Sequence, residues 1–301
     1  MGFKVICMAK SIVLEGPEGV GKTTQASLLG YLLEEYAKLP ILRVREPGGT
    51  PVGEAIRSVL FTSEFRNMDA TTNVLLFSAS RNEVLVNKVK PWLEENPTGI
   101  SIGDRDWWST IALQASDGAD PGYIEATQKP FMWYPNRTYY LDLPAEESIV
   151  RVRMAKIKEG VRNWRDDVPI ETYREIRENY LSLVKKWQDK VCLVDAFKDP
   201  WNVTFDIVRD LLLEMKTEEP TRELATDLLK NFNYSTLRKI ADKANDEGRV
   251  PYSRLSRDAE LEREVRIKEG FSEQGQLREK MYKDWENLGL VRPRINTEHE
   301  R

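Results

Sequence analysis

Residues 11–24, SIVLEGPEGVGKTT, decide the fold of this chain. An apolar run from Ile12 to Leu14 predicts a short strand, and the glycines that follow it predict a tight loop. The loop contains the pattern G-x-x-x-x-G-K-[ST], filled by Gly16, Gly21, Lys22 and Thr23. Backbone N–H groups of such a loop, and the start of the helix after it, converge on an anion. We therefore predict a phosphate-binding loop in which Lys22 reaches the β- and γ-phosphates and Thr23 holds Mg²⁺. The alternative is a glycine turn with an exposed lysine.

Composition argues against several classes of function. The chain has 301 residues, of which 41% are hydrophobic and 31% charged, as expected of a soluble globular protein with one large or two smaller domains. No apolar run is long enough for a membrane helix, so we expect no membrane partner. A net charge of −4 gives little support to nucleic acid as the main partner.

The rare residues indicate a compartment and restrict the chemistry. Cys7 and Cys192 form no disulfide framework, and the N-terminus lacks a secretory pattern, so we expect a cytoplasmic protein. The single histidine, His299, lies next to the C-terminus, which argues against histidine acid–base catalysis and histidine metal sites. Phosphoryl transfer remains possible, because it depends on positioning and charge neutralisation.

Apolar runs alternate with helical patterns through the first two thirds of the chain. The runs that predict strands are 12–14, 41–44, 99–103, 138–143 and 191–194. The patterns that predict helices are 25–38, 70–88, 146 onward, 170–189 and 200–215. Such alternation is typical of an α/β fold, with a parallel β-sheet flanked by helices and ligands bound at the carboxyl ends of the strands. We expect a loop at 45–53, where proline and glycine are frequent.

Several polar side chains follow these strands. Arg45 is a candidate anion ligand, or else a solvated arginine at a strand end. Asp104 lies where a second Mg²⁺-orienting group belongs, and Arg105 would point into the same cleft. Phe77 and Arg81 are four residues apart and share a helix face, so they could stack on a base and bind its edge. Spacing alone favours the alternative, in which Phe77 is core and Arg81 is surface.

The stretch from about 151 to 168 is strongly basic and is interrupted by Gly160. We predict a lid, because a phosphoryl-transfer site needs a cover that excludes water and adds cations. A solvated charged helix is the alternative.

Four ordered signatures resemble the thymidylate kinase family of P-loop nucleoside monophosphate kinases. They are LEGPEGVGKTTQ at 14–25, REPGGTPVGEAIR at 45–57, LLFSASR at 75–81 and DRDWWSTIALQ at 104–114. The resemblance covers residues 10 to about 215 and implies a P-loop kinase fold. It also implies phosphorylation of dTMP to dTDP by ATP with Mg²⁺, a step of dTTP biosynthesis, by a homodimer.

The resemblance also implies roles for individual residues. The loop residues that would hold ATP are Gly16, Glu18, Gly19, Val20, Gly21, Lys22, Thr23 and Thr24. Those that would bind the acceptor are Glu18 at its sugar, Arg45 and Arg105 at its phosphate, Phe77 and Arg81 at its base, and Gln114. Thr23 and Asp104 would place Mg²⁺, and the catalytic residues would include Lys22 and Arg105.

One family arrangement has an arginine inside the phosphate loop, whereas the other supplies it from the lid. Gly19 stands after Glu18 here, so we expect the second arrangement, with Arg162 or Arg165 as the catalytic cation and Arg153 in reserve.

Two departures from the family leave the acceptor open. Asp106 and Leu113 stand where the family usually has tyrosine. The alternatives are therefore a kinase for dUMP or a 5-substituted pyrimidine deoxynucleotide, or a non-catalytic nucleotide-binding module.

Residues 216–301 extend beyond the kinase-like part, 1–215. This extension carries 18 Lys and Arg against 18 Asp and Glu, and its leucines recur at helical spacing. We predict a charged, mostly helical extension of unknown function, either a small partner module or helices packed on the kinase.

Overall fold

The computed structural model describes residues 10–160, 168–217, 221–247, 259–271 and 273–290. Its centre is a sheet of five parallel strands in the order β2-β3-β1-β4-β5. The strands are β1 (Lys10–Glu15), β2 (Ile41–Arg45), β3 (Ile100–Asp104), β4 (Arg137–Asp142) and β5 (Val191–Asp195). The predicted α/β fold is confirmed, and each predicted apolar run overlaps one of these strands, with Gly99 and Leu143 just outside β3 and β4.

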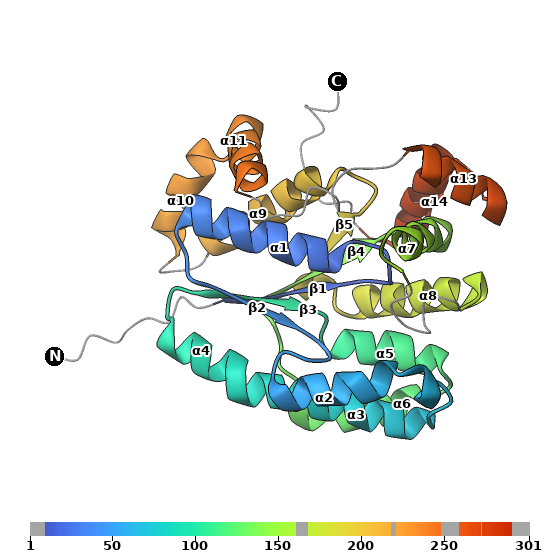
Figure 1. Cartoon of the computed structure of the whole chain (residues 1–301). Coiled ribbons are helices and arrows are strands. Elements are labelled where there is room, and N and C mark those ends of the chain that lie inside the picture. Colours follow the sequence, from blue (N-terminus) through green and yellow to red (C-terminus); the bar gives the residue numbers. More distant parts are fainter. Residues whose placement is uncertain (1–9, 161–167, 218–220, 248–258, 272, 291–301) are drawn as a thin grey trace.

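Helices cover both faces of the sheet (Figure 1). One face carries α1 (Lys22–Leu32) and α9 (Pro200–Thr217). The opposite side carries α2 (Pro51–Phe61), α3 (Ala70–Val84), α4 (Lys90–Glu95), α5 (Trp107–Ser116), α6 (Pro121–Gln128) and α8 (Ile170–Lys186). The helix α7 (Ala145–Glu159) follows β4. Within the described ranges, each helix is too short or too polar to cross a bilayer.

Two details of the helices differ from the prediction. The expected loop at 45–53 ends early, because α2 begins at Pro51. Proline is favourable there, since the first helical residue needs no N–H partner, and the Thr50 side chain accepts from the Gly53 N–H at 3.0 Å. The helix α6 was not predicted; it also begins with proline, Pro121, and is capped by Asp120.

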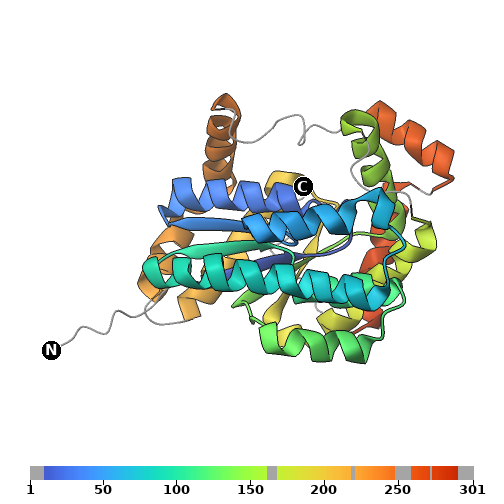
Figure 2. The same cartoon turned by 60° about the horizontal axis from the view of Figure 1, so that its bottom comes forward.

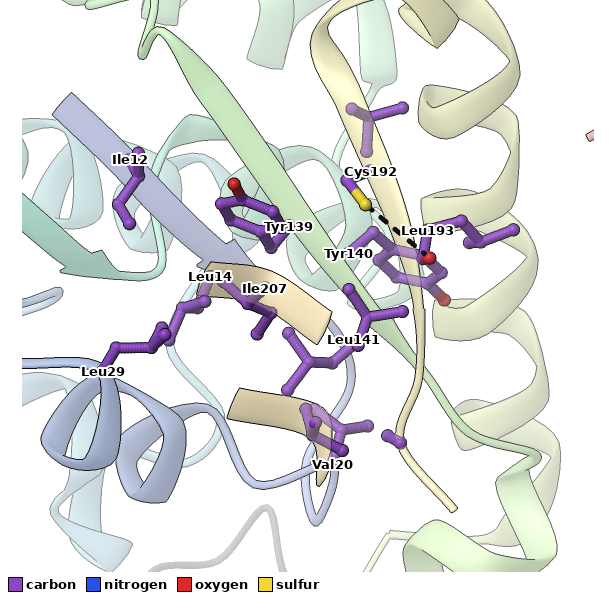
Figure 3. Packing of buried hydrophobic residues seen from close by; sticks show 14 of the residues in the cluster. Ile12, Leu14, Val20, Leu29, Tyr139, Tyr140, Leu141, Cys192, Leu193 and Ile207 are labelled. Carbon is purple, nitrogen blue, oxygen red and sulfur yellow. Dashed lines mark hydrogen bonds between the residues drawn. The ribbon is translucent and has the colours of Figure 1, made fainter. Parts of the chain in front are cut away.

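The core is continuous from the sheet to the helices around it. Figure 3 shows Leu14 of β1 close to Ile207 of α9, on the side where Leu29 of α1 also lies. Tyr139 and Tyr140 of β4 are both fully buried. Because β1 and β4 are buried on both faces, their middle residues, 12–14 and 139–141, are apolar in succession without alternation of polar residues.

The extension is helical, as predicted, and packs on the rest of the chain. Its described helices are α10 (Arg222–Asn231), α11 (Tyr234–Asp246), α13 (Ala259–Glu269) and α14 (Gln274–Asn287). The first two lie against α9 and α1, and the last two lie against α7 (Figures 1 and 2). Residues of the extension, among them Phe232, Met281 and Trp285, belong to the same hydrophobic cluster as the sheet.

Two buried carboxylates join α14 to the sheet. Asp142 and Asp195, which are partners in the register of β4 and β5, lie at the carboxyl ends of those strands. The indole N–H of Trp285 donates to Asp142 at 2.6 Å, and the Arg278 guanidinium donates to Asp195 at 2.6 Å. Since a buried charge is costly without partners, α14 is part of the folded core.

Replacing Trp285 tests this packing. Trp285 is among the largest fully buried side chains. We expect Trp285→Ala to lower the free energy of unfolding by about 3–5 kcal/mol, because it leaves a cavity and removes a donor from Asp142. Urea denaturation measures the change. The control is Leu213→Ala on α9, where the side chain is 46% exposed and the expected change is within about 0.5 kcal/mol. Equal effects of the two substitutions would contradict the packing of α14 on the sheet.

Candidate functional site

The phosphate loop connects β1 to α1 and is shaped by glycine. Gly16, Gly19 and Gly21 have φ values of 144°, 79° and 93°, which L side chains rarely adopt. A Cβ at Gly16 would lie 2.5 Å from the Leu141 carbonyl oxygen of β4, and one at Gly19 would lie 2.6 Å from the Ser148 carbonyl oxygen of α7. The loop backbone therefore lies directly against β4 and α7.

Lys22 is buried at the first turn of α1. Its ammonium group donates to the carbonyls of Gly16 at 2.8 Å and Pro17 at 2.6 Å, within the same loop. Burial, followed by the positive charge of Arg105, lowers the pKa of Lys22 to about 8, although nearby carboxylates oppose the shift. The alternative of a glycine turn with an exposed lysine is wrong.

Thr23 and Asp104 meet between α1 and β3. The Thr23 hydroxyl donates to Asp104 Oδ2 at 2.5 Å. An alcohol and a carboxylate are oxygen donors of the kind that Mg²⁺ prefers, so this pair fits the ion. Nowhere in the described part of the chain do three or more His, Cys, Asp or Glu side chains form a metal cluster. Any Mg²⁺ at this pair would therefore keep water and phosphate oxygens as further ligands.

Arg105 joins the phosphate loop to α5 and α8. Its guanidinium donates to Glu18 Oε1 at 2.7 Å, to the Gly16 carbonyl at 3.2 Å, to the Ser109 hydroxyl at 2.9 Å and to the Tyr180 hydroxyl at 3.2 Å. Burial alone would lower the pKa of Arg105, but the Glu18 carboxylate and other acids raise it above its ordinary value, so the side chain stays charged. Arg105 also has a φ of 79°, a conformation that costs energy in a residue other than glycine.

Glu15 supports this arrangement, and the sequence analysis gave it no role. It is fully buried at the end of β1 and accepts from the N–H of Asp106 at 2.7 Å and from the hydroxyls of Ser109 at 2.7 Å and Tyr180 at 2.9 Å. The only local signal is an acid that ends an apolar strand immediately before the loop. Its partner Tyr180 lies 165 residues away in sequence, so no spacing could have predicted the contact.

Arg81 is held from several sides at the inner face of α3. Only 4% of its side chain is exposed, so the alternative of a surface arginine is wrong. It forms an ion pair with Glu46 at 2.7 Å and donates to the Asp106 carbonyl at 2.7 Å and the Thr110 hydroxyl at 3.0 Å. Phe77 lies one turn earlier on α3, is mostly buried, and contacts Phe61 edge to face.

The remaining acceptor candidates are Arg45 and Gln114. Arg45 ends β2 beside Asp104 in the sheet register and forms an ion pair with Glu54 of α2 at 3.3 Å. Gln114 is fully buried on α5. No role was predicted from the sequence for Arg57 of α2, which donates to the Pro47 carbonyl at 3.0 Å. Burial and the nearby charge of Arg45 lower the pKa of Arg57. The sequence feature that could have indicated Arg57 is its place at the end of the REPGGTPVGEAIR signature.

The two departures from the family pattern have structural partners. Asp106 caps α5 by accepting from the Trp108 N–H at 2.9 Å. Burial, reinforced by the neighbouring Glu15, raises the pKa of Asp106 well above its usual range. Leu113 is buried in the main hydrophobic cluster. Both residues are therefore engaged in packing and capping.

The structure describes only part of the segment that is predicted to form a lid. The helix α7 carries its first cations, including Arg153, which forms an ion pair with Glu269 of α13 at 3.7 Å. Arg162 and Arg165, the expected catalytic cations, lie outside the described residues.

Strand order and loop geometry define the class of protein. A parallel sheet with β1 at its centre, followed by a glycine-rich loop and a helix, is the arrangement of P-loop nucleotide-binding proteins. Comparison with known proteins narrows the class. The family model for thymidylate kinase matches residues 14–207.

Individual proteins agree with this match. A thymidylate kinase of Leuconostoc mesenteroides subsp. mesenteroides is 36% identical over 205 residues, covering 67% of this chain and 93% of that protein. A thymidylate kinase of Bacillus cytotoxicus is 33% identical over 209 residues, covering 68% of this chain and 97% of that protein. The crystal structure of thymidylate kinase from Ehrlichia chaffeensis superimposes with a TM-score of 0.54 at 28% identity, covering 67% of this chain and 98% of that one.

The chain belongs to the thymidylate kinase family, and it is a kinase. The helices α10, α11, α13 and α14 lie beyond the matched residues.

The lowered pKa of Lys22 predicts how ATP affinity depends on pH. Phosphates bind the charged ammonium, whereas the free protein loses this charge as pH rises through about 8. We expect the Kd for ATP to be nearly constant from pH 6.5 to about 7.5 and then to rise, approaching about tenfold per pH unit above pH 8. Titration of a fluorescent ATP analogue measures it. Lys22→Arg keeps its charge and should lack the rise. The same rise in both proteins would contradict the assignment to Lys22.

Proposed function

We propose that this protein transfers the γ-phosphoryl group of ATP to dTMP and releases ADP and dTDP. The observation that carries the proposal is the convergence of Lys22, Arg105 and the Thr23–Asp104 pair on one phosphate loop, in a chain of the thymidylate kinase family. All four side chains lie at the carboxyl edge of a parallel sheet, which is where such folds bind ligands.

The mechanism follows from these positions. Backbone N–H groups of residues 16–24 bind the phosphates of ATP, and Lys22 turns from the loop carbonyls towards the β- and γ-phosphates. Thr23 and Asp104 would hold Mg²⁺, which supplies positive charge against the phosphate oxygens. Arg105, which is already charged and fixed, binds the phosphate of the acceptor. An acceptor phosphate oxygen is anionic at neutral pH, so the in-line attack needs no strong general base.

Further residues complete the proposal. Glu18 faces the acceptor sugar, Arg45 binds the acceptor phosphate together with Arg105, and Phe77 and Arg81 bind the base, with Gln114 nearby. We assign the kinase activity to residues 1–215, with a lid at about 151–168, and leave the extension 216–301 without a chemical role. We also propose a cytoplasmic homodimer, as the family resemblance implies.

A panel of acceptors tests this function. Full-length protein is assayed for ADP release with dTMP, dUMP, dCMP and 5-substituted dUMP, and Lys22→Ala serves as the inactive control. We expect dTMP to have the highest kcat/KM and the control to lose nearly all turnover, because Lys22 neutralises the transferring group. A dTMP value below that of dUMP would make this a different pyrimidine nucleotide kinase. ATP binding without turnover of any acceptor would contradict a catalytic function.

The lid cations have their own test. We expect the double substitution Arg162→Ala and Arg165→Ala to lower kcat by about 10³-fold, with a much smaller effect on ATP affinity, if these residues neutralise the transferred phosphoryl in the transition state. Steady-state kinetics separates the two effects. Arg174→Ala on α8, which removes an exposed arginine paired with Glu146, is the control. A fall in kcat below tenfold would exclude this role.

A further inference from the structure

The helix α7, which leads into the predicted lid, packs directly against the phosphate loop. A Cβ at Gly19 would lie 2.6 Å from the Ser148 carbonyl oxygen, 3.3 Å from Val152 Cγ2 and 3.4 Å from Arg151 Cβ. The same helix ends at Glu159, and Gly160 after it directly precedes the segment that contains Arg162 and Arg165. Displacement of α7 would therefore change both the phosphate loop and the start of the lid.

The first turn of α7 carries a buried acid that the extension binds. Only 1% of the Glu147 side chain is exposed. Within α7, Arg151 donates to it at 3.1 Å. Its other partners come from the extension: Arg266 of α13 contacts Oε2, and Gln274 of α14 donates to Oε1 at 3.0 Å.

A second acid, on the extension, binds the two side chains of the extension that also bind Glu147. Glu262 of α13 accepts from Arg266 at 2.9 Å and also contacts Gln274. Arg266 thus lies between two carboxylates, one on α7 and one on its own helix. Burial alone would lower the pKa of Arg266, but Glu147 and Glu262 raise it, so the guanidinium stays charged. The position of the Arg266 guanidinium is therefore restricted, because moving away from either acid would leave a buried charge without its partner.

The extension is itself fixed to the sheet. Besides the contacts of Trp285 and Arg278 with the strand ends, Arg177 of α8 binds both Asp142 at 2.9 Å and Asp284 of α14 at 2.8 Å. The extension also contacts α7 away from Glu147, because Arg153 of α7 forms an ion pair with Glu269 of α13 at 3.7 Å. A groove of about 460 Å³ opens between α7 and α13 towards Gly160, lined by Arg153, Lys156 and Lys268 among others. The buried polar contacts between the two helices lie at the Glu147 end, where the side chains of Glu147 and Arg266 are 1% and 11% exposed.

We propose that the extension positions α7 against the phosphate loop, and that Arg266 is the positioning residue through its contact with Glu147. This inference rests on the proposed kinase function and adds a role for residues that lie beyond the family match. Arg266 does not touch the phosphates; it acts through Glu147 and the backbone of α7. Among the proposed acceptor residues, Arg45, Phe77 and Arg81 come from β2 and α3, whereas Glu18 belongs to the loop itself. Acceptor binding should therefore depend less on this contact than ATP binding does.

Substitution of Arg266 in the full-length protein tests the inference. We expect Arg266→Gln to lower kcat and raise the KM for ATP, each by about fivefold, which is within the range by which residues of coupled networks act. The KM for dTMP should change less than about twofold. Assays are made well below the melting temperature of each variant. Arg266→Lys, which keeps the charge, should restore part of the loss. Arg263→Gln on the same helix, where the side chain is exposed, is the matched control and should behave as the unsubstituted protein.

Two further measurements separate positioning from stability. Hydrogen exchange of residues 16–24 and of α7 should become faster in Arg266→Gln, whereas β2 and α3 should be unchanged. In a double-mutant cycle, Glu147→Gln combined with Arg266→Gln should lose little more activity than either alone, because both remove one contact.

The outcomes distinguish this inference from the proposed function. The positioning role would be overturned if Arg266→Gln had the same kinetic constants and hydrogen exchange as the unsubstituted protein. It would also be overturned if Arg263→Gln lost as much activity as Arg266→Gln. Additive losses in the cycle would also overturn it. If the unsubstituted protein forms no dTDP, the proposed function fails, yet the Kd for a fluorescent ATP analogue still tests whether Arg266→Gln weakens the phosphate loop.

Discussion

The phosphate loop can occupy its position only because Gly16 and Gly19 have no side chains. Each approaches a backbone carbonyl so closely that a Cβ would lie within 2.6 Å of the oxygen, and each has a positive φ. These contacts place the loop against β4 and α7. The direction of Lys22, the approach of Thr23 to Asp104 and the reach of Arg105 all depend on that placement.

Buried carboxylates at the ends of three strands bind arginine side chains or support the residues around them. Glu15 ends β1 and supports the residues around Arg105, whereas Asp142 and Asp195 end β4 and β5 and bind α8 and α14. Parallel strands bring such residues to one edge, where each acid is satisfied by arginine, tyrosine or tryptophan. The same edge therefore carries the proposed catalytic residues at β1 and β3 and the attachment of the extension at β4 and β5.

Local patterns predicted much of this structure, and long-range pairing did not. The strand, loop and helix of residues 11–24 follow from short-range spacing, as do the five strands and most helices. Arg81 was harder, because spacing alone favoured a surface position and its burial depends on Glu46 and Asp106, which come from other loops. Trp285 and Asp142 are 143 residues apart, so the sequence predicted the helices of the extension but not what they touch.

The central claim is that ATP on the phosphate loop gives its γ-phosphoryl to dTMP bound beside Arg105. Rapid-quench analysis of the full-length protein with γ-labelled ATP and dTMP follows that group directly through a single turnover. The account predicts that the label leaves ATP and enters the β-phosphate of dTDP at the same rate. Label released only as inorganic phosphate, or retained in ATP while dTMP is saturating, would contradict it.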